Sequence, residues 1–115
     1  EASFVKYAIN SYLGMKVTFF NQLHDAALDF SCSPQRIIDA VSADKRIGYS
    51  HTRVPGFDGK KGFGGACLPK DMNAFVKFNQ DLTLIAESVK INNKMREEYE
   101  LDEREKNNNI KFEDK

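Results

Sequence analysis

A cysteine behind a cluster of glycines is the part of this sequence best suited to chemistry. The segment reads Gly62-Phe-Gly-Gly-Ala-Cys67-Leu-Pro-Lys-Asp71. Glycines let the backbone come close to a ligand, and they let it adopt positive φ without strain. The thiolate is the nucleophilic form of cysteine, and a helix N-terminus and a nearby lysine both favour it. Because Asp71 could orient or activate a water, the pattern is typical of covalent catalysis by a thiol.

A purely structural interpretation competes with this one. An isolated cysteine is more often a small buried hydrophobe, and the glycines could form only a turn. Local chemistry alone therefore leaves both interpretations open. Cys32 has no comparable motif around it, so we expect it to pack in the interior. His24 and His51 lack metal-ligand spacing with either cysteine, and we predict no metal site.

Helices are expected to position these residues. Over residues 2–30, apolar residues recur at steps of three and four, which predicts one long helix: Val5, Ile9, Tyr12, Leu13, Val17, Phe20, Leu23 and Ala27. Gly14 inside it is mildly costly and could permit close approach of another backbone. Ser33 before Pro34 is a helix-start signal, and a short helix should run to about Asp44.

The middle of the chain is predicted to be a long loop. Six of the seven glycines lie between Gly48 and Gly65, and loops of this length are usually functional or disordered. We expect Asp71 to cap a third helix and a last long helix to run from about Leu84 to Tyr99. The predicted fold class is all-α, with a Gly-rich catalytic loop. Residues 1–99 should form one helical domain, and 100–115 a polar, flexible tail.

Composition agrees with a soluble protein. Of the 115 residues, 41% are hydrophobic and 30% are charged. Seventeen basic and seventeen acidic residues cancel, so we expect neither a nucleic-acid nor a membrane partner. Two cysteines are too few for a disulfide framework and suit a reducing compartment, which predicts a cytoplasmic location.

Three blocks of the sequence together resemble the UDP-glucose/GDP-mannose dehydrogenase family. The Cys67 segment resembles the family's nucleophile signature. The opening of the family's central domain resembles Glu1-Ala-Ser-Phe-Val-Lys6-Tyr-Ala-Ile-Asn10, and its Arg-Ile-Gly segment resembles Asp44-Lys-Arg46-Ile-Gly48. The match covers residues 1 to about 98, and the ordered set is more specific than any one block. The resemblance implies oxidation of a sugar alcohol to a carboxylate with NAD.

The resemblance also implies catalytic roles for four residues. Cys67 resembles the nucleophile that attacks the aldehyde from the first oxidation, forming a thiohemiacetal and then a thioester that water hydrolyses. Lys6 resembles the lysine that stabilises the developing alkoxide, with Asn10 as its partner. Asp71 resembles the carboxylate that works with Lys6 and a water. A spacing of four puts Lys6 and Asn10 on one helix face, as these roles require.

The resemblance implies six substrate contacts: Phe63, Gly64, Gly65, Arg46, Arg53 and Lys70. The glycine segment resembles the loop that packs on glucose, and Arg46 an arginine that reaches into a neighbouring subunit's site. The run over residues 54–61 is longer than in many relatives, which puts Arg53 in doubt. The Arg46-Ile-Gly48 segment and Lys70 favour UDP-glucose over GDP-mannose. Outside these motifs, Arg46 would be read as a cation at a helix C-terminus.

The sequence lacks the expected cofactor site. No Gly-x-Gly-x-x-Gly follows a strand, so NAD should be bound by a domain absent from this chain, which in the family precedes the central domain. Either the chain is an excised domain or the natural product is reduced. The isolated chain is then predicted to be inactive. The family pairs its central domains through long helices, which implies a homodimer. Alternatives are a GDP-mannose 6-dehydrogenase domain and a stand-alone dimerisation or interaction module.

Overall fold

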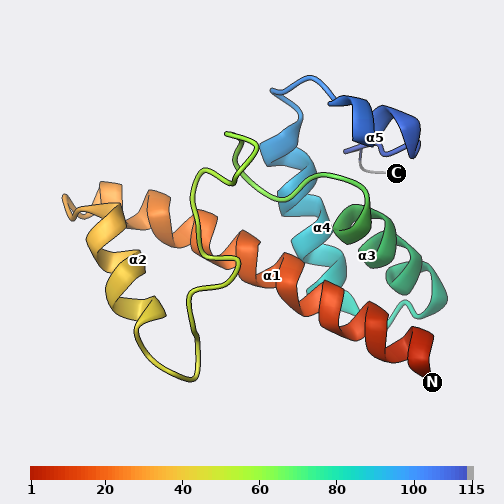
Figure 1. The fold of residues 1–115 in the computed structure, drawn as a ribbon, viewed down its shortest axis with the longest axis horizontal. Coiled ribbons are helices and arrows are strands. Elements are labelled where there is room, and N and C mark those ends of the chain that lie inside the picture. Colours follow the sequence, from red (N-terminus) through yellow and green to blue (C-terminus); the bar gives the residue numbers. More distant parts are fainter. Residues whose placement is uncertain (114–115) are drawn as a thin grey trace.

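The computed structural model describes residues 1–113, which contain five helices and no strand (Figure 1). They are α1 (Ala2–Asp29), α2 (Pro34–Ser42), α3 (Cys67–Phe78), α4 (Thr83–Arg96) and α5 (Glu103–Asn107). The all-α prediction is confirmed. The long helix α1 contacts α2, α3 and α4, so it is the element on which the others are arranged.

Local signals in the sequence explain where α2 begins and how it packs. The Ser33 side chain accepts a hydrogen bond from the Arg36 backbone N–H at 3.5 Å, and Pro34 is the first helical residue. Ile38 then meets Phe20 of α1 and Val54 of the long loop in a buried apolar cluster. The second helix and the loop that follows it are therefore anchored to the C-terminal half of α1.

Helices α1 and α3 meet closely at Gly14. A Cβ atom at this position would collide with the Met72 Sδ and would lie 3.4 Å from the Phe63 ring. Met72 is fully buried, at 0% exposure. The close approach is thus made by side chains rather than by the backbone that we expected. Gly14 sets the separation of the two helices that carry the predicted catalytic residues.

Helix α3 begins at Cys67, so the predicted start at Asp71 is wrong. Pro69 is the third helical residue, where its missing N–H would have had no partner within the helix. Ala66 precedes the helix and makes no side-chain cap bond, so no residue type marks the start. Cys67 and Asp71 consequently lie one turn apart on the same helix face.

Residues 101–110 differ from the flexible tail that the sequence predicts. Helix α5 opens with a reciprocal capping box: the Asp102 side chain accepts from the Glu105 N–H at 2.8 Å, and the Glu105 side chain accepts from the Asp102 N–H at 3.0 Å. Glu105 is 0% exposed and Ile110 is buried. Residues 114 and 115 of the predicted tail lie outside the described residues.

Replacing Gly14 with alanine should lower the free energy of unfolding by about 1–3 kcal/mol, the usual cost of overpacking a core. The clash with Met72 should outweigh the better helix propensity of alanine, which is worth roughly 1 kcal/mol. Urea denaturation followed by circular dichroism measures the change. Met72→Ala should relieve the clash, so the double variant should lose less than the sum of the single losses. Additive losses, or a Gly14→Ala chain as stable as the parent, would contradict this account.

Candidate functional site

A cluster of three polar side chains lies where α1 packs on α3. The Asn10 Nδ2 donates to the Asp71 Oδ2 at 2.6 Å, and the Lys6 Nζ lies 3.9 Å from the same oxygen. Lys6 and Asn10 are one turn apart on α1, so both reach one carboxylate on α3. The Asp71 side chain is 5% exposed, whereas that of Lys6 is 65% exposed. The cluster therefore combines a buried carboxylate with an ammonium group open to solvent.

Cys67 lies at the beginning of the helix that carries Asp71. Its thiol is free and exposed, and it precedes Asp71 by one helical turn. Two of the four predicted catalytic residues, Lys6 and Asn10, thus reach the third, Asp71, and the fourth, Cys67, lies on the same face of α3 as Asp71. Cys32 is also exposed, against expectation, because it falls in the turn between α1 and α2, where the neighbouring residues are open to solvent.

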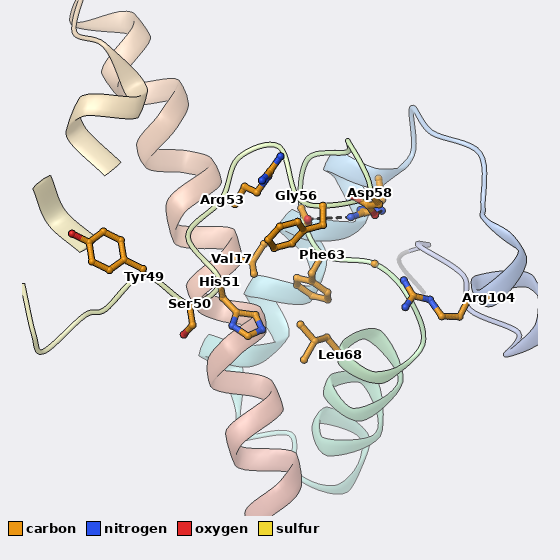
Figure 2. A pocket seen from close by; sticks show the side chains of 14 residues that line it. Val17, Tyr49, Ser50, His51, Arg53, Gly56, Asp58, Phe63, Leu68 and Arg104 are labelled. Atoms are coloured by element: carbon orange, nitrogen blue, oxygen red, sulfur yellow. Dashed lines mark hydrogen bonds and ion pairs between the residues drawn. The ribbon is translucent and has the colours of Figure 1, made fainter. Parts of the chain in front are cut away.

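A cavity of about 440 Å³ opens beside the N-terminal end of α3 (Figure 2). Phe63 and Gly64 of the predicted substrate loop line it, together with Leu68, the residue that follows Cys67. Arg53 lines the opposite side, and its guanidinium lies 4.6 Å from the centre of the Phe57 ring. Figure 2 shows Phe63 of the glycine segment and Leu68 of α3 near one another, with Arg53 of the long loop farther off. Two predicted loop contacts and Arg53 therefore share one cavity.

The cavity is positively charged. Arg96 is 3% exposed, and its Nη1 pairs with the Asp58 Oδ2 at 2.9 Å. Burial alone would raise the pKa of Asp58, but hydrogen bonds from Arg96 and from the Lys60 N–H outweigh it and leave that pKa lowered. Arg53 and Arg104 also line the cavity, and neither forms an ion pair with any residue in 1–113. Their free charges suit an anionic ligand such as a phosphate ester.

The glycine loop, residues 62–65, is held through its backbone. The Asn21 Oδ1 accepts from the Gly62 N–H at 3.1 Å. Asn92 bonds both polar groups of Phe63, accepting from its N–H at 2.7 Å and donating to its carbonyl oxygen at 3.0 Å. Gly62 and Gly65 have φ of +77° and +78°, a region that favours glycine. Side chains of α1 and α4 thus supply the hydrogen bonds that a helix or strand would otherwise give to the backbone of Gly62 and Phe63.

Side chains from α4 and α5 also approach the glycines themselves. A Cβ at Gly62 would collide with the Asn92 Oδ1, and one at Gly64 would collide with the Glu105 Oε2. One at Gly65 would lie 2.8 Å from the Arg104 Nη2. From the sequence we expected this closeness to serve a ligand. In the structure, part of that space is taken by residues that follow in the chain.

The remaining predicted substrate contacts, Arg46, Lys70 and Gly65, are not among the residues that line the cavity. The Arg46 side chain is 87% exposed and pairs with Asp44 at 2.7 Å, and this hydrogen bond lowers the pKa of Asp44. The Lys16 Nζ donates to the Ile47 carbonyl at 2.7 Å, which ties the Arg46-Ile-Gly48 segment to α1. Lys70 is exposed on α3, and Gly65 is buried beneath Arg104.

Sequence reasoning missed the side chains that hold the glycine loop. They are polar, buried and on helices: Asn21, Asn92, Arg96 and Glu105. A signal existed for two of them, because Ser88, Asn92 and Arg96 recur at every fourth residue along α4. A polar stripe on the buried face of a helix must find partners. Ser88 donates to the Thr18 hydroxyl of α1, whereas Asn92 and Arg96 bond backbone groups of the loop and Arg96 also pairs with Asp58.

Neither a membrane span nor a metal cluster is found within residues 1–113. No helix there is both long and apolar enough to cross a bilayer. No three His, Cys, Asp or Glu side chains in that range group as metal ligands would.

Comparisons with known proteins agree with the three sequence blocks. Residues 1–96 match the model of the UDP-glucose/GDP-mannose dehydrogenase family, central domain. The chain is 30% identical to UDP-glucose 6-dehydrogenase YwqF of Bacillus subtilis over 97 residues, covering 81% of this chain and 21% of that protein. It is 37% identical to a UDP-glucose 6-dehydrogenase of Streptococcus pneumoniae over 101 residues, covering 86% and 24%.

A third relative, a UDP-glucose 6-dehydrogenase of Campylobacter jejuni, is 44% identical over 71 residues, or 62% of this chain and 17% of that protein. No solved structure matches the chain significantly. The chain spans about a fifth of the length of these relatives. Because the family model covers most of its length, the chain belongs to the UDP-glucose/GDP-mannose dehydrogenase family and represents its central domain.

Proposed function

We propose that this chain is the central domain of a UDP-glucose 6-dehydrogenase and supplies the cysteine nucleophile and part of the sugar site. The contact of Lys6 and Asn10 with Asp71 carries the proposal. Residues from two sequence blocks, Asn10 and Asp71 being 61 positions apart, meet at one carboxylate oxygen. The relatives named UDP-glucose 6-dehydrogenase support UDP-glucose as the substrate. The cavity with Arg53 and Arg104 offers positive charge for the diphosphate.

The chemistry that we assign to Cys67 is addition to an aldehyde. Its Sγ forms a bond to the aldehyde carbon of the half-oxidised sugar, and the carbonyl oxygen becomes an alkoxide that takes up a proton. Lys6 supplies the positive charge that stabilises this alkoxide. Once that carbon has reached the thioester level, water adds to it and the thiol leaves, which yields the carboxylate. Asp71 and Asn10 hold Lys6 in place and orient the water.

The two oxidations need NAD, and the described residues do not fit this cofactor. A dinucleotide is held by a glycine-rich turn between a strand and a helix, and residues 1–113 contain no strand. Within 62–65 the glycines pack against protein side chains instead. We therefore derive no hydride step from this chain and expect the 115-residue chain alone to reduce no NAD.

Cys67→Ser should lower the formation of UDP-glucuronate on the order of a thousandfold in the polypeptide that the complete reading frame encodes. A serine hydroxyl is a much weaker nucleophile, so the second oxidation should fail and the reaction should stop at the aldehyde level. NADH absorbance measures turnover, and mass spectrometry identifies the sugar product.

Cys32→Ser is the matched control, because it removes the other exposed thiol and should leave turnover nearly unchanged. A Cys67→Ser enzyme with the parental rate would rule out the nucleophile assignment. Faster turnover of GDP-mannose than of UDP-glucose would instead overturn the assignment of UDP-glucose as the substrate.

We also propose that the chain pairs with a second copy through α1. Val5, Ile9 and Tyr12 are 54%, 54% and 57% exposed, and their spacing puts them on one face of this helix. Such a stripe can be buried against its own copy about a two-fold axis. The exposed Arg46 side chain, which pairs with Asp44 within this chain, would then be available to a neighbouring subunit, as the family resemblance implies.

Sedimentation equilibrium of the 115-residue chain tests the pairing. We expect a dimer at concentrations on the order of tens of micromolar, typical of a stable homodimer. Ile9→Asp should weaken it by placing a charge in the apolar stripe. Gln22→Asp, which adds the same charge at another exposed position of α1, should not. A monomeric parent chain at these concentrations would contradict the proposal.

A further inference from the structure

Glu105 connects the C-terminal helix α5 with the glycine loop. It is completely buried, at 0% exposure. It also lies beyond residue 96, where the match to the family model ends. The contacts of this residue are therefore a property of this chain that the family match does not cover.

Each carboxylate oxygen of Glu105 has its own partner. The Oε1 accepts from the Asp102 N–H at 3.0 Å and closes the start of α5. The Oε2 accepts from the Gly65 N–H at 2.9 Å. Hydrogen bonds to an ionised group are roughly twice as strong as neutral ones, and a buried N–H left without its acceptor is costly. Formation of α5 and the conformation of the loop thus depend on the same side chain.

Arg96 supplies the positive charge that allows Glu105 to be buried. Its Nη1 lies 3.7 Å from the Glu105 Oε2, and the two side chains are 2% and 1% exposed. Its Nη2 donates to the Gly62 carbonyl oxygen at 3.0 Å. Arg96 therefore holds the first residue of the glycine loop while Glu105 holds the last.

The hydrogen bond between the Gly65 N–H and Glu105 lies two residues before the proposed nucleophile, Cys67. Gly65 has φ of +78°, Ala66 is the residue that precedes α3, and Cys67 is the first helical residue. Asn21 and Asn92 bind the upstream residues Gly62 and Phe63. Glu105 binds the loop residue closest in sequence to Cys67 among those held by side chains. The direction in which the chain enters α3 depends on this bond.

We infer that Glu105 is a positioning residue for Cys67 and the glycine loop, a role that rests on the proposed dehydrogenase function. It is fully buried and acts through the Gly65 N–H. Loss of its carboxylate should loosen the loop on the side of Cys67, weaken sugar binding and displace the thiol from its working position.

Amide hydrogen exchange of the 115-residue chain, measured by NMR, tests the contact. Glu105→Ala should accelerate exchange of the Gly65 N–H about tenfold or more, as expected for one lost hydrogen bond. Glu105→Gln keeps an acceptor oxygen of the same reach and should restore part of the protection. If the alanine variant does not fold, the glutamine variant should still show the Gly65 proton resonance shifted upfield.

Asp58→Asn is the matched control. It removes the other carboxylate that faces Arg96 without touching Gly65, so Gly65 exchange should stay at the parental rate. Unchanged exchange in both Glu105 variants, or an equal acceleration in Asp58→Asn, would overturn the inference.

Steady-state kinetics of the complete polypeptide separate positioning from mere stabilisation. Glu105→Ala should raise KM for UDP-glucose about tenfold and leave KM for NAD unchanged, with Glu105→Gln between the two. A loss of folded enzyme alone would lower kcat and change neither KM, which would overturn the inference. If the parent oxidises no nucleotide sugar, the proposed function fails, and the Gly65 exchange result alone decides whether Glu105 positions the loop.

Discussion

The rest of the structure depends on one requirement: the buried backbone of the glycine loop must find hydrogen-bond partners without a strand or a helix. An unpaired buried N–H or C=O costs as much as a lost hydrogen bond, so each must be satisfied. Asn92 meets the requirement most directly, because it bonds both polar groups of Phe63 as a neighbouring strand would. Glycines make this possible, since a Cβ at Gly62 would collide with that same amide.

This requirement links the loop to the helix pair that carries the polar cluster. Phe63, held by Asn92, packs toward Gly14 of α1 and is 5% exposed. Met72 of α3 fills the same contact, one residue after Asp71. Close packing therefore couples the glycine loop to the Asn10–Asp71 bond and to the start of α3. A displacement of any one of the three shifts the other two.

The features that could be predicted from sequence are those with local causes. The apolar periodicity of α1 and the Ser33-Pro34 start of α2 are written in neighbouring residues, and both helices appear with nearly the expected ends. The start of α3 could not be read because Ala66 carries no capping group. Helix α5 is only five residues long, and Glu105 is buried by contacts with residues 40 positions away. Its capping box was visible in the sequence, but its tertiary contacts were not.

The candidate site divides in the same way. The motif blocks predicted Lys6, Asn10 and Asp71, and the fold brings these three together. No motif marked Asn21, Arg96 or Glu105, because a polar residue that supports a loop from behind has no fixed spacing to the loop that it supports. The polar recurrence along α4 hinted at Arg96, but its role becomes clear only from its burial and partners: it is 3% exposed and lies between Asp58 and the Gly62 carbonyl.

The absence of a side chain at Gly14 makes this position a spacer between α1 and α3. The Met72 sulfur occupies the volume that a methyl group would need, so the two helix axes are as near as these residues allow. Asn10 is one turn from Gly14 on α1, and Asp71 is adjacent to Met72 on α3. Side chains of increasing size at position 14 would therefore change the distance between the Asn10 amide and the Asp71 carboxylate without altering either group. The geometry of the polar cluster can thus be adjusted from a residue outside it.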